Sequence, residues 1–487
     1  MPALRVPPRS WNGRLHRSQT GDARDGRAHS AALLGQPPGS SESAVTYAEA
    51  SAFLYSLERR GVRLGLDRIV GALREHGDPQ EEFPSVLVAG TNGKGSVCAF
   101  VASMLQTAGL RTGLYTSPHL IDFRERIRID GRMIPPETVA ALTDAIGGSV
   151  ARWELSFFEA TTLIAFLWFR ERGVDAAAVE VGLGGRLDAT RPVRAAGTVI
   201  TTISLDHTKI LGGTRSEIAA EKGAILREGV PAALGVSSAE AMAVLRRRAV
   251  EVGAPVSERR RALRVREIVA AGEGTRFLLS PRGGWPLPEA ELSATIFLEG
   301  RHQVANASLA VLAALLLPPR LRPDARAIQD GLSRARWPGR LQRLGSRPPI
   351  YCDVAHNAEG ARSLARGIAQ RGLKDLTLVI GMVEGKDARS VLASLAPHAR
   401  EAHFCTPRTD RALRGEDLAL AGAESGLNGT THETPSDAID AALRSAGERG
   451  GSGGVLVTGS FYTVGEAMAH LGYTPPDPLW ADDRGGA

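Results

Sequence analysis

The chain contains little cysteine, little lysine and few aromatic residues. Its three cysteines, Cys98, Cys352 and Cys405, lie far apart among 487 residues, which excludes a disulfide framework or a cysteine-rich zinc site and suits a reducing compartment. Only 5% of the residues are aromatic. The longest apolar runs, such as residues 310–317, fall far below the roughly 18 residues that a membrane-spanning helix needs. We therefore expect a cytoplasmic protein without a transmembrane segment.

The rest of the composition is that of a folded protein with more than one domain. Hydrophobic residues make up 43% of the chain and charged residues 23%, which excludes wholesale disorder, collagen and coiled coil. The chain is too long for one ordinary core. Its net charge of +6 would permit a nucleic-acid partner, but six arginines against two aspartates in the first 40 residues account for most of it. We therefore expect neither a nucleic-acid nor a membrane partner.

Residues 1–42 differ from the remainder of the chain. They are rich in proline, serine, glycine and arginine and show no apolar periodicity, which is typical of a disordered tail. A transit peptide is the alternative, although the amphipathic pattern of such peptides is absent. From residue 43 onward, helical stretches alternate with short apolar runs that predict strands at residues 85–89, 112–115, 176–181, 198–204, 350–354, 376–380 and 455–458.

This alternation predicts an α/β protein, with ligands at the carboxyl ends of parallel strands. Residues 259–295 break the pattern and predict antiparallel or irregular decoration. A proline- and arginine-rich stretch around residues 337–339 marks a domain boundary. We expect a tail over 1–42, an N-terminal domain with a P-loop-type, mostly parallel sheet over 43–333, and a C-terminal Rossmann-like α/β domain over 334–487.

The sharpest local signal is a glycine-rich loop between a predicted strand and a predicted helix. Residues 90–96 read GTNGKGS. Glycines allow several backbone N–H groups to point at one phosphate, the helix N-terminus adds positive potential, and Lys94 supplies a cation for terminal phosphates. The loop departs from the usual P-loop because Gly95 separates Lys94 from Ser96. An empty tight turn is the alternative, and Lys94 weighs against it.

Three metal-type ligands follow separate predicted strands. These are Ser117, Glu180 and His207. A carboxylate at a buried strand end must be paired or bound to a metal, and a hydroxyl, a carboxylate and an imidazole are reasonable ligands for Mg²⁺ that bridges ATP oxygens. Each residue also has a structural alternative: a turn hydroxyl, an ion pair and a neighbour of a helix cap. Their joint placement at successive strand ends favours a site.

Four further residues carry polar groups in suggestive places. Lys222 lies on a predicted helix with small neighbours, in a chain where only five of the 59 basic residues are lysine; a buried lysine can lose its charge, and a modified one can become a ligand. Asn306 can read an adenine edge or cap a helix. Arg340 can reach phosphates from the domain boundary, and Asp353 can accept from ribose hydroxyls.

Together these motifs resemble the folylpolyglutamate synthase and dihydrofolate synthase family, a branch of the Mur ligase superfamily. The match runs in family order from about residue 45 to the C-terminus, through residues 89–96, 116–120, 157–159, 180–190, 205–208, 221–223, 301–306, 337–341, 353–357 and 459–462. The resemblance implies an ATP-dependent ligase. It would phosphorylate the carboxylate of dihydropteroate, or of the terminal glutamate of a reduced folate, and the amine of L-glutamate would displace the phosphate, with release of ADP and phosphate.

The resemblance also implies a role for individual residues. It assigns ATP binding to Thr91, Asn92, Gly93, Lys94, Gly95, Ser96, Asn306, Arg340 and Asp353, and magnesium to Ser117, Glu180 and His207. It assigns the acceptor pocket to Ser156, Phe157, Phe158, Glu159, Leu187, Asp188 and Ala189. The catalytic candidates are Lys94, an N-carboxylated Lys222 that supports a second ion, and His356 near the incoming glutamate. A monomer is expected.

Two departures and two alternatives accompany the resemblance. Gly213 stands where the family pattern has an acidic residue, and residues 384–387 loosen an acidic-Lys-Asp pattern. A Mur-type ligase of cell-wall precursor synthesis shares the fold and the mechanism, but Gly95 and residues 116–119 favour the folate branch. A catalytically silent nucleotide-binding protein is the second alternative, and the presence of Lys94, Glu180, His207 and Lys222 argues against it.

Overall fold

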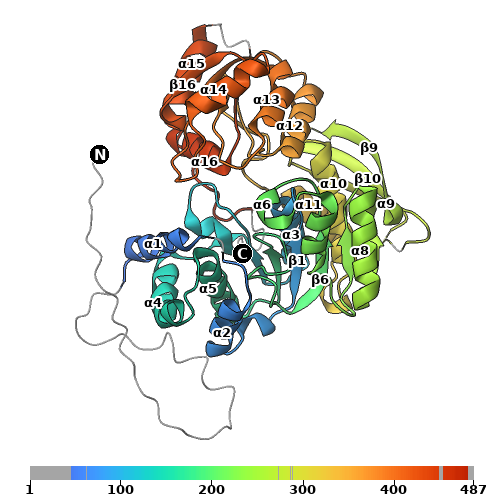
Figure 1. The fold of residues 1–487 in the computed structure, drawn as a ribbon. Coiled ribbons are helices and arrows are strands. Elements are labelled where there is room, and N and C mark those ends of the chain that lie inside the picture. Colours follow the sequence, from blue (N-terminus) through green and yellow to red (C-terminus); the bar gives the residue numbers. More distant parts are fainter. Residues whose placement is uncertain are drawn as a thin grey trace, which may run out of the picture.

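A computed structural model describes residues 45–480, except residues 62, 272–273, 286, 288 and 449–452. The predicted tail over residues 1–42 lies outside the described residues. Three sheets organise the fold, and Figure 1 shows the orange and red C-terminal unit above the blue-to-yellow N-terminal unit. None of the helices in the described ranges combines the length and the apolar character that a bilayer crossing requires.

The N-terminal unit is built on an eight-stranded sheet, sheet A. Its strand order is β4-β3-β2-β5-β1-β6-β7-β8. Only β3 runs antiparallel, to its neighbours β2 and β4, and the other neighbouring strands pair in parallel. The strands are β1 (Ser85–Ala89), β2 (Thr112–Tyr115), β3 (Ile127–Ile129), β4 (Arg132–Met133), β5 (Ala176–Glu180), β6 (Ala195–Ile200), β7 (Ala232–Leu234) and β8 (Val256–Glu258).

Helices cover both faces of sheet A, which explains why β1 is a continuous apolar run. Leu87 and Ala89 face one core, and Val86 and Val88 face the other, because successive side chains point to opposite faces. The first core includes α1 (Tyr47–Ser56), α2 (Asp67–Glu75), α4 (Pro136–Arg152), α5 (Phe157–Glu171), α7 (Arg215–Gly223) and α8 (Ala239–Val252). The second includes α3 (Lys94–Thr107), α10 (Arg301–Leu315) and α11 (Ala325–Arg334).

A small antiparallel sheet, sheet B, completes the second core. It consists of β9 (Leu263–Ala271), β10 (Gly274–Pro281) and β11 (Leu292–Ile296), as expected for the decoration over residues 259–295. Short elements connect the larger ones: η1 (Leu57–Arg60), η2 (Pro79–Glu81), η3 (Phe123–Arg126), α6 (Thr208–Leu211), α9 (Arg259–Ala262), η4 (Pro319–Leu321) and, in the C-terminal unit, η5 (Ala396–His398).

The C-terminal unit is a second α/β layer structure. Its sheet C has the order β12-β13-β17-β14-β15-β16, with only β12 antiparallel. The strands are β12 (Gln342–Leu344), β13 (Ile350–Cys352), β14 (Leu376–Ile380), β15 (Ala399–Cys405), β16 (Gly429–His432) and β17 (Val455–Thr458). One face carries α12 (Ala358–Gln370), α13 (Ala388–Leu395) and α14 (Gly415–Glu424), and the other α15 (Pro435–Glu448) and α16 (Phe461–His470).

Residues 335–341 connect the two units. Helix α11, which packs against α3, ends at Arg334, and sheet C begins at Gln342. We propose that this connection divides the chain into domains of residues 43–333 and 334–487.

Three predicted strands end earlier than expected. The strand predicted over 176–181 is β5, which stops one residue short, at Glu180. The strand predicted over 198–204 is β6, which stops at Ile200, and the strand predicted over 350–354 is β13, which stops at Cys352. After β6 the hydroxyls of Thr201 and Thr202 donate to the carbonyl of Asn92, at 2.7 and 3.3 Å. The backbone there leaves the sheet to support the glycine-rich loop.

A return segment, residues 473–480, leads the chain back from the C-terminal unit to the N-terminal unit. The Leu479 N–H donates to the Gly131 carbonyl (2.8 Å), and the Asp477 carboxylate accepts from the Met133 N–H (2.8 Å). Arg128, which is 2% exposed, donates to the Pro476 carbonyl (2.9 Å). Trp480 lies in the second core of sheet A. The C-terminal unit is therefore attached to the N-terminal unit twice, through residues 335–341 before it and through residues 473–480 after it.

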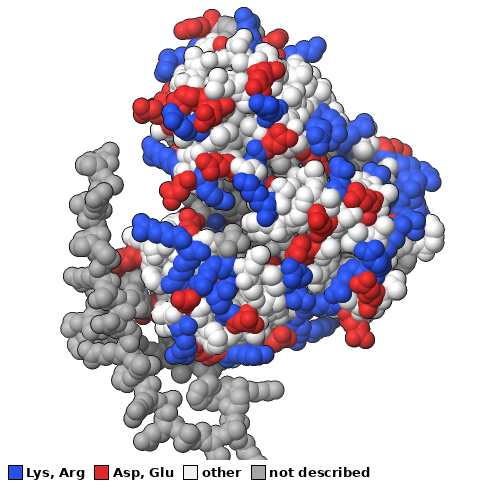
Figure 2. Space-filling model, viewed as in Figure 1, with Lys and Arg blue, Asp and Glu red and all other residues white. Residues whose placement is uncertain are grey.

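Charges of both signs are interspersed on the surface. On the face shown in Figure 2, basic and acidic side chains alternate over both units. That face therefore lacks the single basic strip with which nucleic-acid-binding proteins follow a phosphate backbone.

Trp480→Ala tests the return segment. The side chain is 4% exposed, so its removal should lower the free energy of unfolding of the N-terminal unit by about 3–5 kcal/mol and speed proteolytic cleavage at the segment. Chemical denaturation and limited proteolysis measure both effects. Leu420→Ala, at a side chain 70% exposed, is the control and should change stability by less than about 0.5 kcal/mol. Equal unfolding curves for the two variants would contradict a stabilising role.

Candidate active site

The glycine-rich loop joins β1 to α3, as predicted. Gly93 is the left-handed residue that precedes α3 (φ 85°), and a Cβ there would lie 2.7 Å from Asn306 Oδ1. A Cβ on Gly95 would lie 2.8 Å from the indole nitrogen of Trp337. Both positions therefore require glycine, because Asn306 and Trp337 pack directly onto the loop.

Polar groups around the loop leave donors and acceptors for a ligand. The hydroxyl of Ser96, in the first turn of α3, is buried without a hydrogen-bond partner among the described residues. Asn306 lies in the second turn of α10, whose N-cap is Gly300. The structure therefore excludes helix capping as the role of Asn306, whose amide donates to Gln303 Oε1 (3.0 Å).

Lys94 and two of the predicted metal ligands form one group. Lys94 Nζ lies 3.7 Å from Glu180 Oε1 and 3.4 Å from the Thr91 carbonyl. Glu180 ends β5, is 4% exposed, and accepts from the Ser117 N–H at 3.2 Å. Burial raises the pKa of Glu180, and the charge of Lys94 opposes the shift. A carboxylate in this position gains strongly from a further cation.

The third predicted metal ligand, His207, follows the loop after β6. It takes a left-handed conformation (φ 50°) at the start of α6. Its Nε2 lies 3.5 Å from Lys386 Nζ, and 43% of its side chain remains exposed. Partial withdrawal from water and the charge of Lys386 lower the pKa of His207 to about 4. The imidazole is therefore neutral at pH 7 and retains a lone pair for a ligand.

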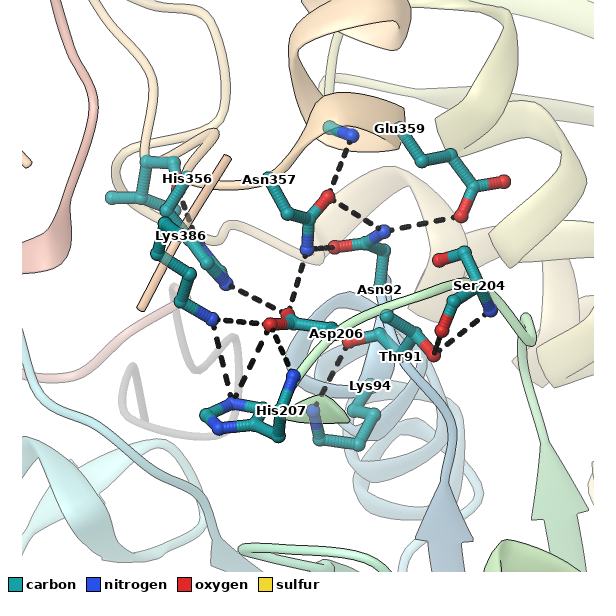
Figure 3. A network of polar contacts seen from close by, with 12 residues as sticks. Thr91, Asn92, Lys94, Ser204, Asp206, His207, His356, Asn357, Glu359 and Lys386 are labelled. Atoms are coloured by element: carbon teal, nitrogen blue, oxygen red, sulfur yellow. Dashed lines mark hydrogen bonds and ion pairs between the residues drawn. The ribbon is translucent and has the colours of Figure 1, made fainter. Parts of the chain in front are cut away.

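Asp206 connects the two units through a network of polar contacts (Figure 3). Its Oδ1 accepts from Lys386 Nζ (2.5 Å), and its Oδ2 accepts from Asn357 Nδ2 (2.9 Å) and lies 3.7 Å from His356 Nε2. Burial opposes its ionisation, but the hydrogen bond from His356 and the charge of Lys386 outweigh burial and hold the pKa of Asp206 below its usual range. Its carboxylate is therefore charged at neutral pH.

The same network includes the glycine-rich loop. Asn92 and Asn357 exchange two side-chain hydrogen bonds (3.2 and 3.0 Å), and Asn92 also donates to Glu359 (3.2 Å). Asn357 caps α12 of the C-terminal unit by accepting from the Gly360 N–H. The first turn of α12 therefore faces the phosphate-binding candidate directly.

Arg340 and Asp353 lie together between the units. The Arg340 guanidinium packs over the Phe461 ring (5.4 Å to its centroid) and acts electrostatically on Asp353 and Glu180. Both carboxylate oxygens of Asp353 accept backbone N–H groups, from Leu341 (2.8 Å) and Ala355 (2.9 Å). Burial raises the pKa of Asp353, against the charge of Arg340. Asp353 thus holds the connection in place whether or not it binds a ribose.

Lys222 is buried on α7. It is 5% exposed, and its ammonium makes no ion pair within the described part of the chain. Burial and the charge of Lys94 lower the pKa of Lys222 to about 7. A Cβ on Gly185 would lie 3.0 Å from the Glu221 carbonyl oxygen and 3.2 Å from the Lys222 carbonyl oxygen. The segment that contains Gly185 therefore packs tightly against α7.

The residues predicted for the acceptor pocket divide into two kinds. Ser156 and Glu159 form a capping box at the start of α5, in which each side chain accepts from the backbone N–H of the other residue (3.4 and 2.8 Å). The Asp188 carboxylate accepts from the Leu183 and Thr190 N–H groups (2.8 and 3.0 Å). These polar groups hold the local backbone. The apolar ones form walls: Phe158 packs on Tyr115 (5.9 Å), and Phe157, Leu187 and Ala189 are buried or partly buried nearby.

Several residues of the network were not predicted as site residues, among them Asp206, Asn357, Glu359 and Lys386. Asp206 and Asn357 stand in recognised motifs beside predicted residues. The rarity of lysine could have marked Lys386 as a site residue, because the chain has only five lysines. Its motif, residues 384–387, was interpreted only as a departure from the family pattern.

Family models match both units of this fold. The model "Mur ligase middle domain" matches residues 88–314, and "Mur ligase, glutamate ligase domain" matches residues 339–461. A phosphate-type loop in one unit, faced by charged residues of a second unit, is the arrangement of this class of ATP-dependent ligases.

Named relatives narrow the class. The chain is 35% identical to the Bacillus subtilis dihydrofolate synthase/folylpolyglutamate synthase, covering 88% of this chain and 99% of that protein. It is 38% identical to a Haloferax volcanii protein named as a probable bifunctional folylpolyglutamate synthase/dihydropteroate synthase; that match covers 87% of this chain but only 50% of the longer archaeal protein.

Solved structures agree with these relatives. Mycobacterium tuberculosis folylpolyglutamate synthase, complexed with ADP and AMPPCP, superposes with a TM-score of 0.82 at 33% identity, covering 88% of this chain and all of that one. A Yersinia pestis bifunctional folylpolyglutamate synthase/dihydrofolate synthase with Mn, AMPPNP and L-glutamate bound gives 0.74 at 31% identity, over 87% and 98%. The chain belongs to the folylpolyglutamate synthase/dihydrofolate synthase family.

Lys386→Met tests the contact between the units. The change leaves Asp206 buried without its cation, and breaking a buried pair typically costs about 3–5 kcal/mol; the side chains are 9% and 7% exposed. We expect a lower unfolding temperature and a larger radius of gyration by small-angle X-ray scattering. Lys374→Met, at an exposed lysine of the same unit, is the control. Identical scattering and unfolding for the two variants would contradict this role.

Proposed function

We propose that the protein is an ATP-dependent ligase that adds L-glutamate to dihydropteroate, to the glutamate tail of reduced folates, or to both. The observation that carries the proposal is the group of Lys94, Glu180 and Ser117 beside the glycine-rich loop, faced by Lys386 and Arg340 from the second unit. Family membership supports the choice of acceptor.

The chemistry requires cations placed in advance. A carboxylate is a poor electrophile, so phosphorylation supplies a leaving group, and the amine of glutamate then attacks the acyl phosphate through an anionic tetrahedral intermediate. In our proposal residues 91–96 bind the triphosphate with backbone N–H groups, and Lys94 binds its terminal end. Asn306, which packs onto Gly93, contacts the nucleotide from the other side of the loop, and Arg340 and Asp353 do so from the connection.

The donor set fits Mg²⁺. Ser117, Glu180 and His207 offer a hydroxyl, a carboxylate and a neutral imidazole, and Ser96 adds a buried hydroxyl that lacks a partner among the described residues. Hard oxygen ligands dominate magnesium sites. The ion, when bound, neutralises phosphate charge. Glu180 holds Lys94 in the loop, and the raised pKa of its buried carboxyl supports a role as a ligand for added positive charge.

The C-terminal unit completes the site in this proposal. His356, whose ring lies 5.8 Å from that of Phe461, faces the incoming glutamate. Phe157, Phe158, Leu187 and Ala189 hold the acceptor's pterin, while Ser156, Glu159 and Asp188 fix the backbone around it. We further propose that the protein is a monomer and that it is cytoplasmic; the three buried, unpaired cysteines support the second statement.

Phosphate release tests the function. ATP turnover by the purified protein should require L-glutamate together with dihydropteroate or a tetrahydrofolate. Lys94→Ala should lower turnover by about 10³-fold or more, because it removes a cation from the developing phosphate charge, while circular dichroism stays unchanged. Lys374→Ala is the matched exposed control.

The outcome also separates the related ligases. Turnover that depends on a UDP-muramyl substrate would replace the proposal with a cell-wall function. ATP binding without turnover on any of these acceptors would favour a silent nucleotide-binding protein.

We also propose that Lys222 is N-carboxylated. Its burial, its lack of an ion pair within the described ranges and its low pKa support a neutral amine that reacts with CO₂. Because the folded pKa is about 7, the reactive amine is lost as the pH falls below 7. Activity of bicarbonate-depleted enzyme should therefore return on adding bicarbonate at pH 8 and return much less at pH 6.

Native mass spectrometry gives a readout apart from activity. At pH 8 with bicarbonate, the wild type should carry one extra carboxyl group, and Lys222→Arg should carry none and respond to no bicarbonate. Equal masses for the two proteins, corrected for the substitution, together with bicarbonate-independent activity, would contradict the modification.

A further inference from the structure

Arg126 is a buried cation without an anionic partner. It ends η3, is 7% exposed, and forms no ion pair within 4 Å among the described residues. Its neighbours differ: Arg124 pairs with Asp122 (2.6 Å), and Arg68 pairs with Glu159 (3.1 Å). A buried, unpaired charge is strongly unfavourable unless something compensates it.

One protein contact sets the direction of the guanidinium. Arg126 Nε donates to His119 Nδ1 at 2.7 Å. Since Nε–H can only donate, Nδ1 of His119 must be the acceptor. No described residue forms a hydrogen bond to the two terminal nitrogens of Arg126, so the forked end that fits a carboxylate stays available. Glu58 acts on this charge only from beyond ion-pair distance.

Aromatic rings surround this guanidinium. Its central carbon lies 5.0 Å from the centroid of Phe157. Tyr55 stacks on Phe157 (5.6 Å, 14° between the rings), and Phe123 meets Phe157 edge-on at 6.1 Å. Tyr55 is 38% exposed, so the cluster opens to solvent on that side. Phe157 is 8% exposed, with Arg126 over its ring and Tyr55 stacked on it. A ligand would therefore enter beside Tyr55 and present a carboxylate to the cation.

The cluster lies between the acceptor pocket and the phosphate loop. Phe157 begins α5, beside Phe158 and the other residues predicted for the pocket. The Arg126 carbonyl accepts from the Thr116 N–H (3.0 Å), and the next residue, Ser117, contacts Glu180. A carboxylate paired with Arg126 would therefore lie near the end of β2, next to β5, which ends at Glu180.

We propose that Arg126 is a substrate-binding residue that pairs with a carboxylate of the pteridine acceptor. His119 is the positioning residue that turns the guanidinium toward this carboxylate. The inference rests on the proposed function. In a glutamylated acceptor, the carboxylate that is not phosphorylated remains anionic throughout the reaction and needs such a partner.

Arg126→Met tests the inference, because it keeps length and removes charge. The KM for the acceptor should rise about 10- to 100-fold, as for loss of a charge-assisted pair, while the KM for ATP changes less than about threefold. Arg126→Lys, which keeps the charge, should recover part of the loss. Arg124→Met is the control two residues away and should leave both constants unchanged. Thermal unfolding with and without ATP checks that each variant is folded.

The possible outcomes distinguish a failure of the proposed role of Arg126 from a failure of the proposed ligase function. A raised acceptor KM supports the inference, and a larger rise for a tetrahydrofolate monoglutamate than for dihydropteroate assigns the contact to the glutamate carboxylate. Unchanged acceptor KM in a folded Arg126→Met protein overturns it and leaves the proposed function intact. Absence of turnover by the wild type with either acceptor overturns the proposed function and, with it, this inference.

Discussion

The arrangement of the two units depends on the buried carboxylate of Asp206. It lies on the loop after β6 and accepts hydrogen bonds from Lys386 and Asn357 of the C-terminal unit. A carboxylate withdrawn from water requires such donors, so the cost of burying it is offset only when the units meet. The same contacts bring the first turn of α12 against Asn92 of the glycine-rich loop. The contacts that compensate the charge of Asp206 therefore also place the C-terminal unit against the glycine-rich loop.

Cations and buried carboxylates lie close together in the site. Lys94, Lys386 and Arg340 act on the carboxylates of Glu180, Asp206 and Asp353. The low polarity of the buried site strengthens these interactions. Cations of both units therefore lie near the glycine-rich loop, which agrees with a ligase whose substrates are anionic.

Local patterns were sufficient for most of the fold. The apolar runs at β1, β2, β14 and β17 give strands with the predicted bounds, because each is buried on both faces of a parallel sheet. The strand predicted through residue 204 was wrong after Ile200, since the hydroxyls of Thr201 and Thr202 bind the phosphate loop instead of continuing the ladder. The group of Lys94, Ser117 and Glu180 could be predicted from strand ends. Lys386 could not be placed by such reasoning, because its contact with Asp206 joins positions 180 residues apart.

The return segment gives the C-terminal unit two attachments, one at residues 335–341 and one at residues 473–480. A unit attached at two separated points has fewer relative orientations available to it than a unit joined by a single linker. The two attachments therefore restrict the C-terminal unit to orientations close to the one in which Lys386 and Asn357 contact Asp206 and Glu359 contacts Asn92 of the glycine-rich loop.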